Sequence, residues 1–182
     1  MRVKRRRSRL LTGLVVLSLL LACGIMCLRD LFSLPYREAV EREAARFGLA
    51  PSLVAGLALA ESHFNAAAVS PAGAIGLMQL TPETHIWLSN RLGCEPGSLT
   101  DAENNLYFGS AYLAFLLEKF SNSETALAAY NAGPARVQGW LADSRYSEDG
   151  STLKQIPFEE TKTHVRRVLL YCSMYRLLYG LE

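Results

Sequence analysis

Several patterns that would indicate a particular class of protein are missing from this chain of 182 residues. Its four cysteines, at positions 23, 27, 94 and 172, lack the spacing of a metal site, and no other metal-ligand motif is present. No stretch alternates apolar and polar residues for long enough to require a β-strand, and there is no internal repeat. We therefore expect neither a metal nor a cofactor, and a mainly α-helical fold.

Acidic residues are missing from positions 1–29, which hold seven of the 19 basic residues and none of the 17 acidic ones. The rest of the chain has 12 basic against 17 acidic residues, a net charge of −5, although the whole chain carries +2. Because the basic excess is confined to one end, it gives no reason to expect binding to nucleic acid.

This basic cluster precedes a long apolar run. Leu10 to Leu28 contains no charged residue and, as a helix, would be about 28 Å long, which is close to the thickness of a bilayer core. Basic residues before such a run stay in the cytoplasm, which places the rest of the chain outside the cell membrane. We favour an uncleaved single-pass signal anchor, because a cleaved apolar region is usually shorter. The alternatives are a secretory signal peptide and a lipoprotein signal ending in Leu20-Leu21-Ala22-Cys23.

Residues 30–35 are expected to form a linker, and residues 36–182 a single globular domain with one core. Apolar periodicity, caps and the positions of Pro and Gly predict helices over 36–47, 51–64, 82–92, 101–120, 123–131, 134–142 and 158–179. A small β element is expected between Ala74 and Leu80. Outside the cell Cys94 and Cys172 could form a disulfide, and two buried free thiols are equally compatible with the sequence.

Glu61 is the most informative single residue. It follows the apolar run Leu53 to Ala60, and on a helix reaching Phe64 it would have Leu57 and Phe64 as neighbours. Burial of a carboxyl disfavours its charged form, so a sheltered Glu can keep a proton for general acid catalysis near neutral pH. On position alone, an exposed Glu at a frayed helix end is the alternative.

Four local patterns occur in a fixed order from Glu61 onward. They are Ala60-Glu61-Ser62-His63-Phe64-Asn65, the segment Ser70 to Leu80 with Gly76-Leu77-Met78-Gln79, the segment Ala128 to Val137, and the segment Ile156 to Tyr171. Each alone is compatible with an ordinary turn, cap or core segment. Together, from about Leu34 to Gly180, they resemble the catalytic domain of the soluble lytic transglycosylase family. This family is a branch of the lysozyme-like superfamily, so the resemblance implies a mainly α, lysozyme-like α+β domain.

The resemblance also implies a reaction. Members of the family cleave the β-1,4 bond between N-acetylmuramic acid and N-acetylglucosamine in peptidoglycan, without water, and leave a 1,6-anhydromuramic end. Glu61 would protonate the glycosidic oxygen and then accept the proton of the C6 hydroxyl as that oxygen attacks C1. One carboxyl is enough because the substrate supplies the nucleophile, whereas ordinary glycosidases need a pair of carboxyls.

By the same resemblance, further residues surround Glu61 and the glycan. Two hydroxyls would support Glu61 or contact the substrate, two side chains would line the sugar cleft, and one phenol would hydrogen-bond Glu61. An amide would serve an acetamido group or the backbone, and one more acid would lie at the cleft. In that order these residues are Ser62 and Ser70, Met78 and Gln79, Tyr130, Asn131 and Glu160. The implied partners are peptidoglycan glycan strands and, through the N-terminal helix, the membrane.

The chain departs from the family at His164, where members often carry Tyr, so the aromatic contact at this place is not expected. His63 and His85 are expected to be surface or core residues and not catalytic bases. Two other functions are compatible with the sequence. One is a lysozyme-type hydrolase that uses a second carboxylate from Glu83, Asp101 or Glu103. The other is a non-catalytic module that binds glycan strands or recruits a partner.

Overall fold

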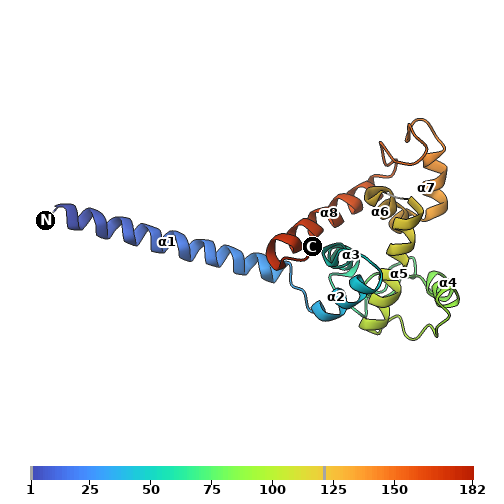
Figure 1. The fold of residues 1–182 in the computed structure, drawn as a ribbon, viewed down its shortest axis with the longest axis horizontal. Coiled ribbons are helices and arrows are strands. Elements are labelled where there is room, and N and C mark those ends of the chain that lie inside the picture. Colours follow the sequence, from blue (N-terminus) through green and yellow to red (C-terminus); the bar gives the residue numbers. More distant parts are fainter. Residues whose placement is uncertain (1, 121) are drawn as a thin grey trace. The chain divides into compact units, whose positions relative to one another are not determined.

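The computed structural model of the chain describes residues 2–120 and 122–182, with side chains from residue 13 onward (Figure 1). The chain divides into two compact units, Met1–Ser33 and Leu34–Glu182. The basic residues at positions 2–9, which the sequence analysis assigned to the cytoplasm, lie outside the described side chains.

The first unit consists of one long helix, α1 (Arg2–Leu31). Within it, Gly13–Leu31 is long and apolar enough to cross a membrane, and none of this window is buried inside the protein. A signal sequence near an N-terminus has the same length and composition. The helix therefore agrees with an anchor and with a signal peptide alike.

The second unit is built from helices over its described residues. They are α2 (Arg37–Arg46), α3 (Pro51–Ser62), α4 (Pro82–Leu92), α5 (Ala102–Phe120), α6 (Ser123–Ala132), α7 (Pro134–Leu141) and α8 (Glu159–Tyr179). The β structure consists of two isolated antiparallel bridges, Val69 with Ile75 and Ile75 with Leu80. The expected mainly helical domain with a small β element is confirmed.

The end of α3 differs from the expectation. The helix stops at Ser62, because His63 and Phe64 have φ of 54° and 59°, in the left-handed region that ends a right-handed helix. The prediction that Phe64 flanks Glu61 on the helix is therefore wrong. The Phe64 ring is buried and packs edge-on against Tyr175, with 6.4 Å between ring centroids.

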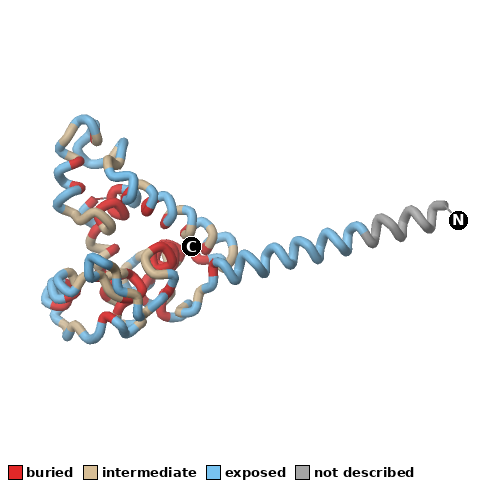
Figure 2. Tube along the Cα trace, turned by 180° about the vertical axis from the view of Figure 1, so that it is seen from behind, coloured by how far each residue is buried: buried red, intermediate tan, exposed pale blue. Residues whose placement is uncertain are grey.

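α3 forms the centre of the second unit. Every residue from Ser52 to Ala60 is buried, which Figure 2 shows as a continuous stretch of buried backbone. α2 and α8 pack against it (Figure 1). α8 comes closest at Gly56, where a Cβ atom would lie 2.8 Å from the backbone nitrogen of Cys172 and 3.0 Å from the carbonyl oxygen of Val168. Only a residue without a side chain permits this approach, so α3 and α8 pack backbone to backbone.

The two cysteines of the second unit are free thiols. Cys94 is half-buried, and Cys172 is buried with its Sγ 3.3 Å from the hydroxyl oxygen of Ser52. Of the two possibilities that the sequence left open, the structure has free thiols and not the disulfide.

Candidate active site

Glu61 lies in the last turn of α3, with its side chain 14% exposed. Its Oε1 lies 2.9 Å from Nε2 of His164, a residue of α8 whose side chain is only 4% exposed. Oε2 has no hydrogen-bond partner among the described residues, and it is not one of the fully buried unpaired atoms. The carboxyl is therefore sheltered, with one oxygen held by the protein and the other accessible.

Two hollows in the surface share one lining residue, and although Glu61 lines neither of them, its partner His164 lines the first. The first contains His164 and is lined by Asn131, Glu159, Glu160, Thr163, His164 and Arg167. The second is lined by residues that include Gln79, Thr84, Tyr112, Tyr130 and Asn131. Asn131 lines both hollows, and its side-chain amide makes no hydrogen bond within the described part of the chain. An elongated ligand lying across both hollows would thus pass an amide with free donors and acceptors.

Ser62 and Ser70 hold the loop that follows α3. The Ser62 hydroxyl donates to the carbonyl of Leu77 at 2.8 Å and accepts from the backbone N–H of Asn65 at 3.2 Å. The Ser70 hydroxyl accepts from the backbone N–H of Ala74 at 3.0 Å. The structure thus gives each hydroxyl a partner in the backbone, and each shapes the loop beside Glu61.

A buried amide that the sequence analysis missed fixes the same loop. Asn105 on α5 is 0% exposed, accepts from the N–H of Met78 at 2.7 Å, and donates to the carbonyls of Ile75 and Leu99, each at 2.9 Å. Gly76 makes room for it, since a Cβ there would lie 2.2 Å from the Asn105 amide nitrogen, and its φ of 85° also favours glycine. The available signal was that Asn105 lies three residues before Phe108, on the apolar face of its helix.

Met78 does not line the cleft with its side chain, contrary to expectation. The side chain is 0% exposed and packs so tightly against α5 that a Cβ on Gly109 would lie 2.3 Å from its sulfur. Its contribution to the site is its carbonyl oxygen, which accepts a hydrogen bond from the Tyr130 hydroxyl at 2.8 Å. The sequence analysis expected that hydroxyl to bond to Glu61, and this hydrogen bond is not formed between the two described side chains.

Tyr130 is nevertheless close enough to Glu61 for the charge of the carboxylate to affect its pKa. Burial raises the pKa of Tyr130 well above its usual range, and the negative charge of Glu61 raises it further. The phenol therefore keeps its proton throughout the physiological range and remains a donor to Met78. In this way the second and third sequence patterns are joined directly beside the carboxyl.

Gln79 and Glu160 each line one of the two hollows. Gln79 has a φ of 50°, and its amide nitrogen donates to the carbonyls of Ala68 at 3.2 Å and Gly76 at 2.9 Å. These bonds leave its amide oxygen unpaired among the described residues and available to a ligand. Glu160 is exposed on the first turn of α8 and lines the same hollow as His164.

The three acids considered for a paired-carboxylate mechanism line other hollows than the two described above. Asp101 accepts from the N–H of Asn104 at 2.8 Å, and Glu103 forms a 3.0 Å ion pair with Arg42; both acids line a separate hollow. Glu83 lines another hollow, next to Trp87. The hollow of Asp101 and Glu103 shares no residue with those two, whereas the hollow of Glu83 adjoins the second through Thr84, Tyr112 and Pro134. Among the described residues no hydrogen bond or ion pair joins any of the three acids to Glu61.

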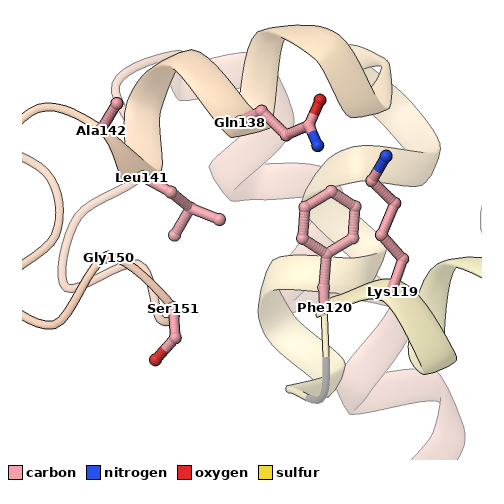
Figure 3. A pocket seen from close by; sticks show the side chains of 7 residues that line it. All are labelled: Lys119, Phe120, Gln138, Leu141, Ala142, Gly150 and Ser151. Carbon is pink, nitrogen blue, oxygen red and sulfur yellow. The ribbon is translucent and has the colours of Figure 1, made fainter.

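A further hollow lies apart from these residues, between the end of α5, α7 and the loop at positions 150 and 151 (Figure 3). It is lined by Lys119, Phe120, Gln138, Leu141, Ala142, Gly150 and Ser151. Among these described residues there is no acid and no nucleophile with an adjacent base. We assign it no part in the chemistry.

The contact of His164 with Glu61 is the main feature that the sequence analysis did not find. It joins residues 103 positions apart, so no local pattern reveals it. The available signal was that His164 shares the buried face of α8 with Val168 and Cys172, at intervals of four residues.

Comparisons with known proteins agree with this geometry. The family described as transglycosylase SLT domain matches residues 38–152. The soluble lytic murein transglycosylase of Escherichia coli (strain K12) is 35% identical over 159 residues, which cover 84% of this chain and 25% of that protein. The membrane-bound lytic murein transglycosylase C of Haemophilus ducreyi is 35% identical over 115 residues, which cover 56% of this chain and 31% of that protein. The chain thus spans about a quarter to a third of these relatives' length.

Solved structures show the same similarity. An inactive mutant of the lytic transglycosylase Slt from Pseudomonas aeruginosa superposes with a TM-score of 0.74 at 34% identity, over 85% of this chain and 26% of that one. The 70 kDa soluble lytic transglycosylase from Escherichia coli superposes with a TM-score of 0.73 at 33% identity, over 84% of this chain and 26% of that one. In sequence and in fold, the chain belongs to the transglycosylase SLT domain family.

Proposed function

We propose that this chain is a peptidoglycan lytic transglycosylase, which cleaves the bond between N-acetylmuramic acid and N-acetylglucosamine without water and forms 1,6-anhydromuramyl ends. The observation that carries the proposal is the placement of Glu61. A single carboxyl, 14% exposed, contacts His164, which lines one of two hollows that share Asn131, and its second oxygen is accessible. Relatives named as lytic murein transglycosylases support the assignment.

The chemistry needs one proton and one carboxyl. Protonated Glu61 donates its proton to the glycosidic oxygen, the C1–O bond breaks, and the bonding electrons leave with that oxygen. The C6 hydroxyl of the same muramyl residue then attacks C1, and its proton passes to the Glu61 carboxylate. The enzyme returns to its starting state, and no second carboxyl is needed because no water is activated.

The other residues hold the glycan or the carboxyl. Glu61 supplies the proton, and the substrate's own N-acetyl group assists the departure of the leaving oxygen. The Gln79 amide oxygen, the Asn131 amide and Glu160 offer hydrogen bonds to sugar hydroxyl and acetamido groups across the two hollows. Ser62 and Ser70 keep the loop in place beneath them.

Digestion of purified sacculi by the full chain in detergent, followed by mass spectrometry, tests the proposal. Anhydromuramyl products, which are lighter than hydrolysis products by one water, are expected. Glu61→Gln should lower turnover by at least about 10²-fold, since general acid–base catalysis contributes about 10²- to 10⁴-fold, with the fold retained. Glu103→Gln, in a hollow that shares no residue with the other two, is the matched control and should keep normal turnover. Reducing ends, or full activity of Glu61→Gln, would contradict the proposal.

We also infer that α1 holds the enzyme at the cell membrane as a single-pass anchor, with the second unit on the outer side. The apolar length of Gly13–Leu31 and the similarity to a membrane-bound relative support this placement. The mass of the N-terminus of protein recovered from membranes tests it. An intact N-terminus is expected, whereas cleavage before Cys23 with a lipid on its thiol would replace the anchor by a lipoprotein.

A further inference from the structure

The imidazole of His164 touches the proposed catalytic carboxyl through one nitrogen only. Nε2 lies 2.9 Å from Oε1 of Glu61, whereas Nδ1 is fully buried and has no hydrogen-bond partner in the described part of the protein. The side chain as a whole is 4% exposed. The two nitrogens therefore have very different surroundings, and these surroundings decide where the ring carries its hydrogen.

A hydrogen on Nδ1 would be an unpaired donor in a buried place. Both the charged imidazolium and the neutral Nδ1–H form require that hydrogen. Orphaned buried N–H groups are rarer in proteins than under-satisfied acceptors, so both of these forms carry the cost of an unmet donor. The neutral form with its hydrogen on Nε2 avoids the orphaned donor and directs its N–H at the Glu61 carboxyl.

The other polar groups near His164 do not change this conclusion. On α8, Glu160 lies one turn earlier, and Arg167 donates to the backbone carbonyl of Ala60 at 3.3 Å. Glu159 forms an ion pair with Lys162 at 2.8 Å. From α6, Tyr130 donates to Met78. Within the described residues none of these groups bonds to the imidazole, so Glu61 is its partner.

We propose that His164 is a positioning residue for Glu61. As a neutral Nε2–H donor it engages Oε1, and the transferable proton is thereby directed to Oε2, the oxygen that has no partner in the described part of the protein. The same hydrogen bond forms whether Glu61 is protonated or ionised, because Oε1 accepts in both states. The ring therefore keeps one charge and one tautomer while Glu61 gives up and recovers its proton. This role rests on the proposed transglycosylase function.

Two amide substitutions at His164 test whether activity requires a hydrogen-bond donor at the position of Nε2 or only a polar side chain. The amide nitrogen of His164→Gln reaches the position of Nε2, whereas that of His164→Asn reaches only the position of Nδ1. With the full chain in detergent and soluble uncrosslinked glycan strands, His164→Asn and His164→Phe should lose about 10- to 100-fold in kcat, the usual effect of a lost hydrogen bond to a charged group. His164→Gln should stay within a few-fold of the unsubstituted enzyme, and KM should change little in all three.

His85 provides a matched control. Like His164, it is 4% exposed and has one buried nitrogen without a partner among the described atoms, in this case Nε2. Its ring packs edge-on against Phe108, with ring centroids 4.4 Å apart. His85→Gln should leave kcat unchanged even where it lowers stability. Equal losses in His164→Gln and His164→Asn, or full activity of His164→Phe, would overturn the proposal.

A spectroscopic measurement decides the tautomer without relying on activity. The chain has three histidines, so ¹⁵N-labelled histidine gives few signals, and the His164 signal is the one lost in His164→Gln. At neutral pH it should show the neutral Nε2–H tautomer, with a hydrogen-bonded proton that changes in Glu61→Ala. An Nδ1–H tautomer or an imidazolium would refute the proposal. An enzyme that makes no anhydro products would instead refute the proposed function, while the tautomer remains measurable.

Discussion

Two loops of the second unit are both tied by side-chain hydrogen bonds, but the ties come from different places. The loop between α3 and α4 is held by Asn105, which reaches it from α5 and is fully buried. The loop between α7 and α8 is held largely by its own acids, the half-buried Asp143 and the exposed Asp149, with one longer hydrogen bond of 3.3 Å from the N–H of Leu153 to the buried Thr125 hydroxyl of α6. The first loop carries Gln79 and the acceptor for Tyr130, whereas the second carries none of the proposed site residues.

The difference concerns what each loop is fixed against. Asp149 accepts from the N–H groups of Ser151 at 2.8 Å and Thr152 at 2.7 Å, so it shapes only its own turn. Asn105 joins Ile75, Met78 and Leu99, so it ties a loop to the core. The loss of a hydrogen bond to a buried amide costs more free energy than the loss of an exposed one, because water replaces the missing partner at the surface. A loop that must hold a carboxyl's neighbours in place is therefore tied from inside.

Asn105→Ala should produce the largest effect on stability. It leaves the buried N–H of Met78 and the carbonyl of Leu99 without partners, and each such loss costs about 1–3 kcal/mol, whereas the Ile75 carbonyl keeps the N–H of Leu80. We expect the free energy of unfolding in urea to fall by about 3 kcal/mol or more, with loss of activity. Asn104→Ala, whose amide serves Pro96 and Ser98 near the surface, is the control. Equal losses from both changes would remove the distinction between the loops.

Gly109→Ala should have the next largest effect. The new Cβ would lie 2.3 Å from the Met78 sulfur and 2.6 Å from its Cβ, and overpacking of this kind costs about 1–3 kcal/mol. Because Met78 supplies the acceptor for Tyr130, turnover should fall as well. Gly139→Ala on α7, with nothing within 4 Å, should instead stabilise by about 0.5–1 kcal/mol. Thermal unfolding of the pair tests the opposite signs.

Acid should affect the α7–α8 loop slightly and selectively. Hydrogen bonds from Arg145 lower the pKa of Asp143 to about 2, and those from Thr152 and Ser151 lower the pKa of Asp149. The unfolded value is about 3.9, so the stabilisation is present above about pH 4 and is lost as the pH falls toward about 2. Asp143→Asn with Asp149→Asn should flatten this part of the pH–stability curve by a small amount, because water reaches both carboxylates and screens their interactions. An unchanged slope between these pH values would contradict the assignment.

Much of the fold follows from local signals in the sequence. Thr81 caps α4 by accepting from the N–H of Thr84, as its place before Pro82 predicts. Asn122 caps α6 in the same way. These signals are local because a cap or a periodic face involves residues within one or two turns. They placed seven helices of the second unit within a few residues of their observed ends.

The site required contacts that local signals do not contain. Glu61 was identified from its surroundings in sequence, but its partner His164 lies on another helix. The orientation of Met78 was misjudged because the side chain and carbonyl of one residue point to different environments, and only packing against α5 decides between them. Asn105 escaped notice because a buried polar residue is explained only by partners elsewhere in the chain.

The close approach of α3 and α8 at Gly56 affects the distance between Glu61 and His164. Glu61 stands five residues further along α3, about 7.5 Å along its axis. His164 stands two helical turns before Cys172 on the helix that touches Gly56. Glu61 and His164 therefore lie on two helices whose separation is set by the absence of a side chain at Gly56. A larger residue at position 56 would push α3 and α8 apart. It would lengthen the 2.9 Å contact between Glu61 Oε1 and His164 Nε2 although it contacts neither residue. The geometry at Glu61 thus depends on a glycine that lines neither of the two hollows.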